Sequence, residues 1–320
     1  MNGLNCNINL ELILVDDWEA GEVYPEGARE KERLRSPENS CQNIKPAWFY
    51  LFKRSDKKYR DQFWVEILAY HLGCMLGISV PPTYPAYSEK NDIAAALIEW
   101  FYADEDINSG KCEFRPGSSY FMKEFAEFDV KTGAQHNIED FIRLTKPIFS
   151  NEQYWHREVA AMLFLDMLIG NTDRHQDNWG ILVDNMTGTS KFAPWFDNGS
   201  SLGHERDTER TKDWDDKQLS QYVHKGKFHF RVDRNCLQTR VPHFELIKIL
   251  RSKNGLVDVD KLLNEMAVYF SRVDFVLIKE VMDQFRGLSL PVAHKIEHER
   301  LEWMKRLLKF RFDKMKEVLK

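Results

Sequence analysis

The sequence contains no long hydrophobic run and no secretion signal. No apolar stretch approaches the roughly 20 residues that a helix needs to span a bilayer, and residues 1–6 lack the basic and apolar regions of a signal peptide. These absences predict a cytoplasmic protein without a membrane partner. Cysteine is also scarce: the five residues are far apart and form no Cys-x-x-Cys pair, so we expect reduced, structural thiols.

The chain also lacks an excess of charge of one sign. Its formal net charge is -5 and its pI is about 6.1, so no general field attracts nucleic acid, and direct nucleic-acid binding is unlikely on this ground. The 320 residues are 43% hydrophobic and 30% charged, which is typical of a globular protein. This length fits one bilobal domain or two ordinary ones.

Two common kinds of metal site are missing as well. A calcium loop needs alternating acidic residues with a central Gly and a terminal Glu, and the polar loops of this chain do not have that pattern. Zinc needs close pairs of Cys or His ligands, and none lie near His175. Magnesium remains the better candidate.

The sequence does contain a very apolar run followed directly by a polar loop. Residues 159–169 are apolar on nearly every face, which predicts a helix that is buried on all sides. The helix should end at Gly170, a C-cap signal. The polar side chains that follow therefore stand on a rigid platform, and we expect the chemistry of the protein in this loop.

Two short strand-like runs follow the loop. They are residues 179–183 and 191–196, joined by a turn at 185–188. Asp197 comes directly after the second run. Because a hairpin returns the chain to its starting edge, we expect Asp197 to meet the polar loop.

Three side chains in these loops suit a magnesium-nucleotide site. Asp173 and Asn178 lie five residues apart, and Asp197 arrives from the neighbouring strand end. Magnesium takes oxygen ligands, often one or two protein groups together with phosphate oxygens, which favours Asn178 and Asp197 as ligands. Asp173 can then orient or deprotonate a hydroxyl, the division of labour found in protein kinases. Each residue alone would be an ordinary cap or turn residue.

Two motifs carry a family resemblance: LIGNTDRHQDNWGIL, followed by APWFDNGSSLG. They resemble the catalytic and metal-binding loops of the HipA-like kinases, bacterial protein serine/threonine kinases with a phosphoinositide-kinase-like catalytic core. The resemblance implies that Asp173 is the catalytic base and that Asn178 and Asp197 hold the metal. The order Asp-Arg-His is the reverse of the His-Arg-Asp of ordinary protein kinases, so that analogy assigns no role to Arg174 or His175.

An earlier Lys and Glu complete the kinase pattern. Residues 47–53 form an aromatic strand that ends in Lys53, and residues 63–72 form a helix that contains Glu66. A strand Lys held by a helix Glu is the kinase device for gripping the nucleotide phosphates. The alternative is a solvated strand end and a surface helix residue. The segments YLFK and LGISVPP also look like the HipA-like pattern.

A polar segment at residues 24–37 could form a loop over the phosphates. Gly27, Arg29 and Lys31 can offer a backbone donor and positive charge to a nucleotide, although a solvated loop is equally consistent with this composition. HipA-like kinases place a short phosphate-binding loop here and some phosphorylate a serine in it, so the resemblance makes Ser36 a candidate for that modification. A first strand is expected at residues 8–15.

Two further strand-like runs lie at residues 95–101 and 118–125. In a two-lobed nucleotide enzyme the second run would reach the hinge between the lobes. Backbone groups of Lys123 to Phe125 would then meet adenine. The alternative is that these aromatic residues belong to an ordinary core.

From about residue 138 the chain reads mainly helical, apart from the hairpin. Residues 203–227 are polar and occupy the place of a kinase activation segment, or form a solvated loop. Helices are expected at 243–251, at 258–285 with a break near 273–274, and at 293–320. The last has an apolar stripe that we expect to pack on the domain rather than on a membrane or an acidic partner.

We therefore predict an α+β, two-lobed protein-kinase-like fold. Residues 1–125 would form an antiparallel-sheet N-terminal lobe and residues 126–320 a mainly helical C-terminal lobe. The predicted activity is that of an ATP- and magnesium-dependent protein serine/threonine kinase. The alternatives are an AMP transferase, a small-molecule kinase and a non-catalytic nucleotide-binding protein. The resemblance also raises an antitoxin-like regulatory partner, although fewer than thirty residues precede the phosphate loop, whereas HipA toxins have a sizeable N-terminal subdomain there.

Overall fold

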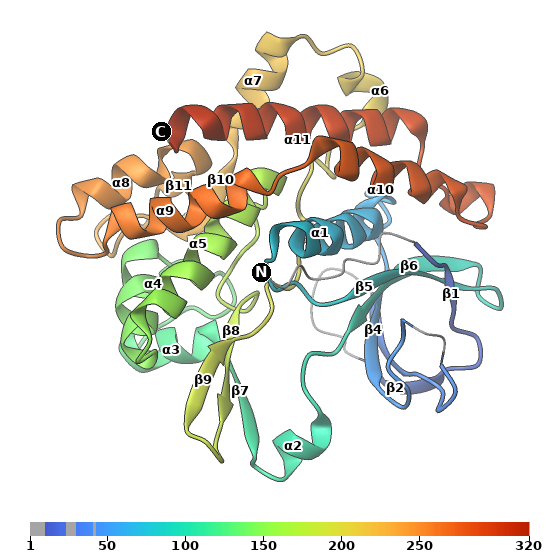
Figure 1. The fold of residues 1–320 in the computed structure, drawn as a ribbon, viewed down its shortest axis with the longest axis horizontal. Helices are drawn as coiled ribbons and strands as arrows, with labels where there is room; N and C mark the ends of the chain where they lie inside the picture. Colours follow the sequence, from blue (N-terminus) through green and yellow to red (C-terminus); the bar gives the residue numbers. More distant parts are fainter. Residues whose placement is uncertain (1–9, 24–29, 41–42, 320) are drawn as a thin grey trace.

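A curled six-stranded sheet forms the N-terminal half of the molecule (Figure 1). The computed structural model describes residues 10–23, 30–40 and 43–319. The strand order is β1-β5-β6-β4-β3-β2, and neighbouring strands are antiparallel except for β1 and β5, which are parallel. The strands are β1 (Ile13–Leu14), β2 (Glu19–Val23), β3 (Lys31–Arg35), β4 (Phe49–Lys53), β5 (Thr83–Ser88) and β6 (Ile93–Glu99).

Strand β4 forms where the aromatic run predicts it. Its side chains alternate between the two faces of the sheet, so Tyr50 and Phe52 enter a small buried cluster with Leu34. Leu51 and Lys53 therefore project from the opposite face. That face carries the Lys of the predicted site.

The sheet corrects two predictions for the first 40 residues. Residues 31–35 form β3, although the polar segment around them predicts a loop. Backbone pairing with β4 compensates for the low strand propensity of its charged residues. The strand expected at 8–15 is only β1 within the described residues, since residues 8 and 9 lie outside them.

Helix α1 (Gln62–Leu76) packs across the sheet (Figure 1). Its apolar side chains, including Trp64 and Leu68, are fully buried, so the helix is fixed in position by hydrophobic packing. It ends at Gly77, whose φ of 72° is the left-handed cap conformation that glycine adopts without strain. The predicted helix around Glu66 is confirmed.

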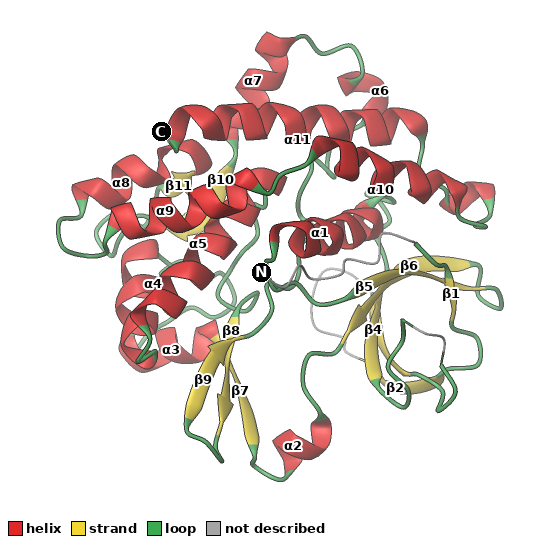
Figure 2. Ribbon diagram, viewed as in Figure 1, coloured by secondary structure: helices red, strands yellow, loops and turns green. Residues whose placement is uncertain are grey.

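The C-terminal half is built around α5 (Glu152–Ile169), which is buried along most of its length, as its sequence predicts. Helices α9 (Val259–Ser271) and α11 (His298–Val318) pack against it. Figure 2 shows that this half is mainly helical. Its other helices are α4 (Ile138–Thr145), α6 (Thr208–Thr211), α7 (Asp216–Lys225), α8 (Leu246–Ser252) and α10 (Phe275–Gly287).

Several predictions for this half are confirmed. The break expected near 273–274 separates α9 from α10. The apolar stripe of α11 is buried on the domain, as we expected. The polar segment 203–227, in contrast, contains the two helices α6 and α7 and the start of β10 (Lys227–Arg231), which pairs with β11 (Arg240–Pro242).

A three-stranded sheet stands below the helices (Figure 2). It consists of β7 (Cys112–Pro116), β8 (Gly180–Asp184) and β9 (Thr189–Phe192). The predicted hairpin is β8 and β9, with its turn at 185–188. β7 pairs with β8, so this part of the chain belongs to the sheet beside α5 rather than to the N-terminal sheet.

The strand predicted at 118–125 is wrong. Residues Gly117–Glu124 form helix α3, and Phe125 N donates to Phe121 O at 2.8 Å. The alternation of aromatic residues is typical of a strand, but burial of Phe121 against His136 and stacking of Tyr120 on Trp179 favour the helix. The change from sheet to helical half therefore lies near residues 100–103, before the predicted boundary at 125. No helix among the described residues has the length and apolarity that crossing a membrane requires.

We predict that Gly117→Ala destabilises the fold. A Cβ at this position would lie 2.3 Å from the Trp179 ring and 2.4 Å from Gln176 O, so α3 and the loop would have to separate. The free energy of unfolding, measured by urea denaturation, should fall by about 1–3 kcal/mol. Gly287→Ala is the control, because a Cβ there meets no atom within 4 Å. Equal stability of the two variants would contradict this packing.

Candidate active site

The loop after α5 and the loop after β9 lie side by side. Gly170 ends α5 with φ 70°, which turns the chain back along the molecule. Thr172 N then donates to Ser200 O at 3.4 Å. The loops that contain Asp173 and Asp197 are thus brought together, as the hairpin predicts.

Lys53 joins the N-terminal sheet to this pair of loops. Its Nζ lies 2.9 Å from Glu66 Oε1 and 2.7 Å from Asp197 Oδ1. The side chains of Lys53 and Glu66 are only 5% and 3% exposed, so the ion pair is buried and weakly screened by solvent. The predicted pairing of Lys53 with Glu66 is present, and the structure adds Asp197 to it.

The second oxygen of Glu66 holds the loop that contains Asp197. Glu66 Oε2 accepts a hydrogen bond from Asn198 N at 2.8 Å. Asp197 itself has φ 57°, a left-handed conformation that is uncommon for a residue with a side chain. Such strain persists only where surrounding contacts impose it, and the contacts of Lys53 and Glu66 do so here.

Asp173 is held by its neighbours on three sides. Its N donates to Asn171 Oδ1 at 2.9 Å, and its backbone O accepts from Asn178 Nδ2 at 2.7 Å. Its Oδ2 lies 3.4 Å from Ser200 Oγ, which donates to it. Backbone and side chain are therefore both positioned.

Burial raises the pKa of the Asp173 carboxyl above its usual range. The charge of His175 opposes this shift, whereas the negative charge of Asp197 adds to it and the hydrogen bond from Ser200 opposes it. Asp197 acts in the same direction as burial because a neighbouring negative charge disfavours ionisation of a carboxyl. A carboxylate whose pKa is raised is a better proton acceptor, as a general base requires.

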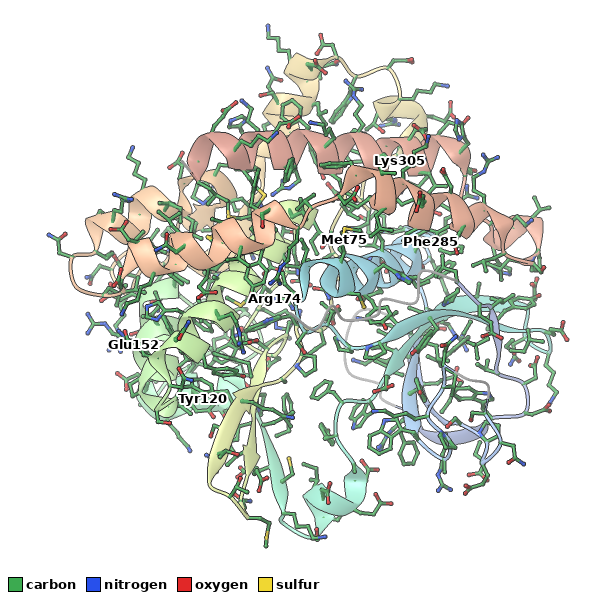
Figure 3. The ribbon with its side chains drawn as sticks, in the orientation of Figure 1. Met75, Tyr120, Glu152, Arg174, Phe285 and Lys305 are labelled. Atoms are coloured by element: carbon green, nitrogen blue, oxygen red, sulfur yellow. The ribbon has the colours of Figure 1, made fainter. Side chains whose placement is uncertain are left out.

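Arg174 lies at the centre of a buried polar network that the sequence argument missed. Its Nε and Nη2 donate to the two carboxylate oxygens of Asp166 at 3.1 and 2.8 Å. Nη2 also donates to Asn198 Oδ1 at 2.6 Å, and Nη1 donates to Asn178 O at 3.1 Å and to Phe196 O. In Figure 3 this side chain is labelled near the centre of the molecule, between α5 and α1. Arg174 therefore fixes both loops to α5.

A signal for this network was present in the sequence. Asp166 interrupts the apolar run 159–169, and a buried carboxylate needs a cation and hydrogen bonds. Both Asp166 and Arg174 have 0% exposed side chains. The sequence therefore predicts a cationic partner for Asp166, but the kinase analogy assigns no role to Arg174.

The donor chemistry of the site fits a magnesium ion. Asp197 supplies a carboxylate, and Asn178 uses its Nδ2 toward Asp173 O, while its Oδ1 makes no hydrogen bond to a described residue. One or two protein oxygens are the usual protein share of a nucleotide-bound magnesium. The described residues contain no group of three or more His, Cys, Asp or Glu side chains that could hold a metal, so Asn178 and Asp197 are the candidates.

The other predicted nucleotide-binding residues have different outcomes. Gly27 and Arg29 lie outside the described residues. Lys31 is the register partner of Lys53 across β3 and β4, and directly opposed residues share a face of the sheet. Two lysines therefore project toward the same side of the sheet, and Lys53 is the one that contacts Asp197.

Lys123 and Phe125 do not lie on a hinge strand. Lys123 is in the last turn of α3, and Phe125 caps that helix and packs beneath Arg234. The backbone N of Phe125 already donates within the helix end. The structural basis for their predicted contact with adenine is therefore absent.

The connection between the two halves is instead residues 100–103, and it is aromatic. Phe101 stacks on Phe196, with ring centroids 5.4 Å apart, and contacts Phe114 of β7 at 5.5 Å. Phe196 precedes Asp197, so the hinge packs directly against the candidate metal loop. Arg33 lies over the ring of Phe49 at the same end of the sheet.

Comparison with known proteins identifies a family that this chain matches. The model of the HipA-like C-terminal domain matches residues 24–252, most of the chain and all of the candidate site. The chain belongs to the HipA-like C-terminal domain family. The predicted resemblance is confirmed.

Two relatives of this HipA-like chain are from Helicobacter pylori and Shewanella oneidensis. The serine/threonine-protein kinase CtkA of Helicobacter pylori strain J99 is 28% identical over 152 residues, which cover 46% of this chain and 42% of the relative. The crystal structure of the Helicobacter pylori proinflammatory kinase CtkA matches with a TM-score of 0.72 at 18% identity, covering 97% of both chains. The HipA of Shewanella oneidensis MR-1, in complex with HipB and its operator DNA, has a TM-score of 0.49 at 12% identity, covering 93% of this chain and 65% of that one.

The likeness to the CtkA structure shows the fold. The mixed α+β architecture, with a curled sheet and a helical half, is that of a kinase structure, and the predicted fold class is confirmed. The matched segment of the curated CtkA sequence is less than half of that protein's length.

We predict that Arg174→Met costs about 3–5 kcal/mol of unfolding free energy, because it leaves Asp166 buried without a counterion. Adding Asp166→Leu should recover part of that loss, since the uncompensated charge is then removed. Chemical denaturation of the single and double variants measures both the loss of unfolding free energy and its partial recovery.

Arg143→Met is the matched control, since Arg143 forms an exposed i,i+4 pair with Glu139 and is 61% exposed. Its loss should cost only about 0.3–0.5 kcal/mol. If the double variant is less stable than Arg174→Met, the loss of stability in Arg174→Met does not come from the uncompensated charge of Asp166.

Proposed function

We propose that this HipA-like chain is an ATP- and magnesium-dependent protein serine/threonine kinase of the cytoplasm. The observation that carries the proposal is the double contact of Lys53, whose Nζ reaches both Glu66 and Asp197. This is the arrangement that grips phosphates beside a metal in kinases. Family membership and the name of the relative CtkA support the choice of reaction and of a hydroxyl acceptor.

The phosphates would be held by the cationic face of the N-terminal sheet. Lys53 and its register partner Lys31 place two ammonium groups on one face, and a phosphate chain would replace Asp197 as the partner of Lys53. Glu66 would keep Lys53 in place during this exchange, because Lys53 Nζ also donates to Glu66 Oε1 of α1.

Asn178 and Asp197 would hold magnesium through their side-chain oxygens. Magnesium, when bound, would neutralise negative charge on the phosphates during transfer. Both residues are kept in place by contacts that do not involve the phosphates: Asn178 Nδ2 donates to Asp173 O, and the loop of Asp197 is held by Asn198 N, which donates to Glu66 Oε2. The protein therefore supplies a preorganised site.

Asp173 would act on the acceptor hydroxyl. It accepts the hydroxyl proton as the hydroxyl oxygen forms a bond to the terminal phosphorus, and the bond from that phosphorus to the bridging oxygen breaks to release ADP. Its raised pKa favours proton acceptance. Ser200 Oγ donates to the carboxylate, and Asn178 Nδ2 donates to the backbone O of Asp173, so both hold Asp173 in position for this transfer.

Adenine would pack against the aromatic hinge. The backbone N and O of Trp100 are engaged by Phe49 O and Trp48 Nε1. Phe101, in contrast, makes no backbone hydrogen bond to a described residue, which leaves its amide available for an adenine edge. The face of β4 and β6 that carries Leu51 and Ile98 would cover the ring.

The substrate would be a protein hydroxyl, and an antitoxin-like protein stays a candidate regulatory partner. The polar segment with α6 and α7 lies beside the catalytic loop, where an incoming chain would meet Asp173. The formal charge of -5 gives no reason to expect direct nucleic-acid binding.

We predict that Asp197→Ala and Asp173→Ala both abolish magnesium-dependent turnover. Loss of a general base typically costs about 10²–10⁴-fold in rate, and Asp197→Ala removes a metal ligand. Asp173→Ala should leave ATP affinity largely unchanged, whereas Asp197→Ala should weaken binding of ATP with magnesium. Turnover is measured with ATP labelled in the terminal phosphate, and binding by calorimetry.

Glu280→Ala is the control, because this exposed acid on α10 is far from the loops in sequence and structure. Full activity of both site variants would refute the kinase assignment. Label in the product from the alpha position of ATP, rather than the terminal position, would identify AMP transfer instead.

We predict that kcat falls as pH is lowered through a pKa above the usual range of an aspartate, because Asp173 must be deprotonated to accept a proton. Ser200→Ala removes a hydrogen bond that lowers the pKa of Asp173, so the acid limb of the pH profile should move to higher pH. Ser252→Ala, on the surface of α8, should leave the profile unchanged. A Ser200→Ala profile that shifts to lower pH would contradict the assignment of Asp173 as the base.

A further inference from the structure

A small, partly open cavity lies behind the catalytic loop, where α11 and α7 meet the segment after Asp197. Its volume is about 160 Å³. α7 and α6 lie against α11 at the top of the molecule in Figure 1. Its lining includes Gly170 and Thr172, so the cavity reaches to within one residue of Asp173.

The wall of the cavity formed by α11 contains a buried guanidinium. Arg311 is 3% exposed, and its Nε donates to Met167 O at 2.7 Å. Its Nη2 lies 2.9 Å from His243 Nδ1. A guanidinium can only donate, so Nδ1 accepts and the other ring nitrogen of His243 donates to Asn171 O at 2.9 Å. The two groups that accept from Arg311, the Met167 backbone carbonyl and the His243 ring, are therefore both neutral.

Arg311 has no carboxylate partner among the described residues. Burial lowers its pKa to about 10, so it keeps its charge at neutral pH. A buried charge without a counterion is unfavourable. The buried Arg174 and Arg300 differ in this respect, because each faces an aspartate, Asp166 and Asp61.

The remaining nitrogen of Arg311 borders the cavity. Its Nη1 makes no hydrogen bond to a described residue. A Cβ at Gly170 would lie 3.1 Å from Nη1, and one at Gly226 would lie 3.4 Å from it. Both glycines line the cavity, so the absence of their side chains keeps the space in front of Nη1 open.

Two further cations stand at the cavity. Lys225, at the end of α7, is exposed and makes no ion pair or hydrogen bond to a described residue. Arg206 is paired with Glu205, whose carboxylate also accepts from Tyr222 Oη at 2.9 Å. The lining thus holds three cations and one carboxylate, an excess of two positive charges.

We propose that this cavity is a binding site for a phosphate dianion, either free or carried on a hydroxyl side chain of this protein. Two negative charges match the excess of the lining, and a tetrahedral oxyanion can accept from Arg311 Nη1, Lys225 Nζ and the Thr172 hydroxyl together. The ligand joins α11 and α7 to the catalytic loop. The site is separate from the cationic face of Lys53.

Calorimetry with inorganic phosphate tests the proposal on the phosphatase-treated full chain, without nucleotide and at constant ionic strength. Wild type should bind phosphate saturably, and Lys225→Met should weaken the affinity about tenfold, the effect of one charge-assisted hydrogen bond. Arg311→Gln should abolish binding. Lys248→Met, an exposed lysine of α8, and Lys53→Met should both retain the wild-type affinity.

Unchanged affinity in Lys225→Met, or loss of binding in Lys53→Met, would overturn the proposal. The second result would place the anion at the nucleotide site. If Arg311→Gln does not fold, Lys225→Met decides. The intact mass of the protein before and after phosphatase identifies the source of the phosphate. A phosphoryl group on residues 203–212 that prevents binding of free phosphate until phosphatase removes it indicates a covalent ligand. An unmodified chain that binds phosphate indicates a free ligand.

Discussion

The carboxylate of Glu66 is the contact on which the arrangement of the site depends. One of its oxygens holds Lys53 of the sheet and the other holds the backbone of Asn198. The helix that carries it is fixed by fully buried apolar side chains such as Trp64. Apolar packing therefore sets the position of one charge, and that charge sets the position of the Asp197 loop relative to the end of β4.

Arg174 performs the corresponding task on the helical side. It binds Asp166 of α5 with two hydrogen bonds and the loop of Asp197 through Asn198. Removing these charges from water is costly, and the complete set of hydrogen bonds offsets the cost. Asn198 is contacted from both sides, by Glu66 and by Arg174, so the two buried clusters act on the same turn. The same low-dielectric surroundings raise the pKa of Asp173.

Elements with a strong local pattern could be predicted from the sequence. The apolar run 159–169, the helical run that contains Glu66 and the hairpin turn at 185–188 are set by local periodicity and turn chemistry. The prediction for residues 118–125 was wrong because a short aromatic segment suits either a strand or a helix. The contacts of Tyr120 with Trp179 and of Phe121 with His136 favour the helix. Residues 31–35 failed for the opposite reason, since pairing with β4 overrides an unfavourable composition.

The sequence by itself determined which side chains are available: the acids at 173 and 197, the amide at 178, and a strand Lys with a helix Glu. Their order along the chain also carried the family resemblance. Only the tertiary structure decided that Lys53 contacts Asp197, that Arg174 connects both loops, and that Arg311 is buried without an acid. The contacts of Lys53 and Arg311 join residues that are 68 to 144 positions apart, and the contact of Arg174 with Asn198 joins separate loops. Local propensities contain no information about which distant groups share a desolvated space.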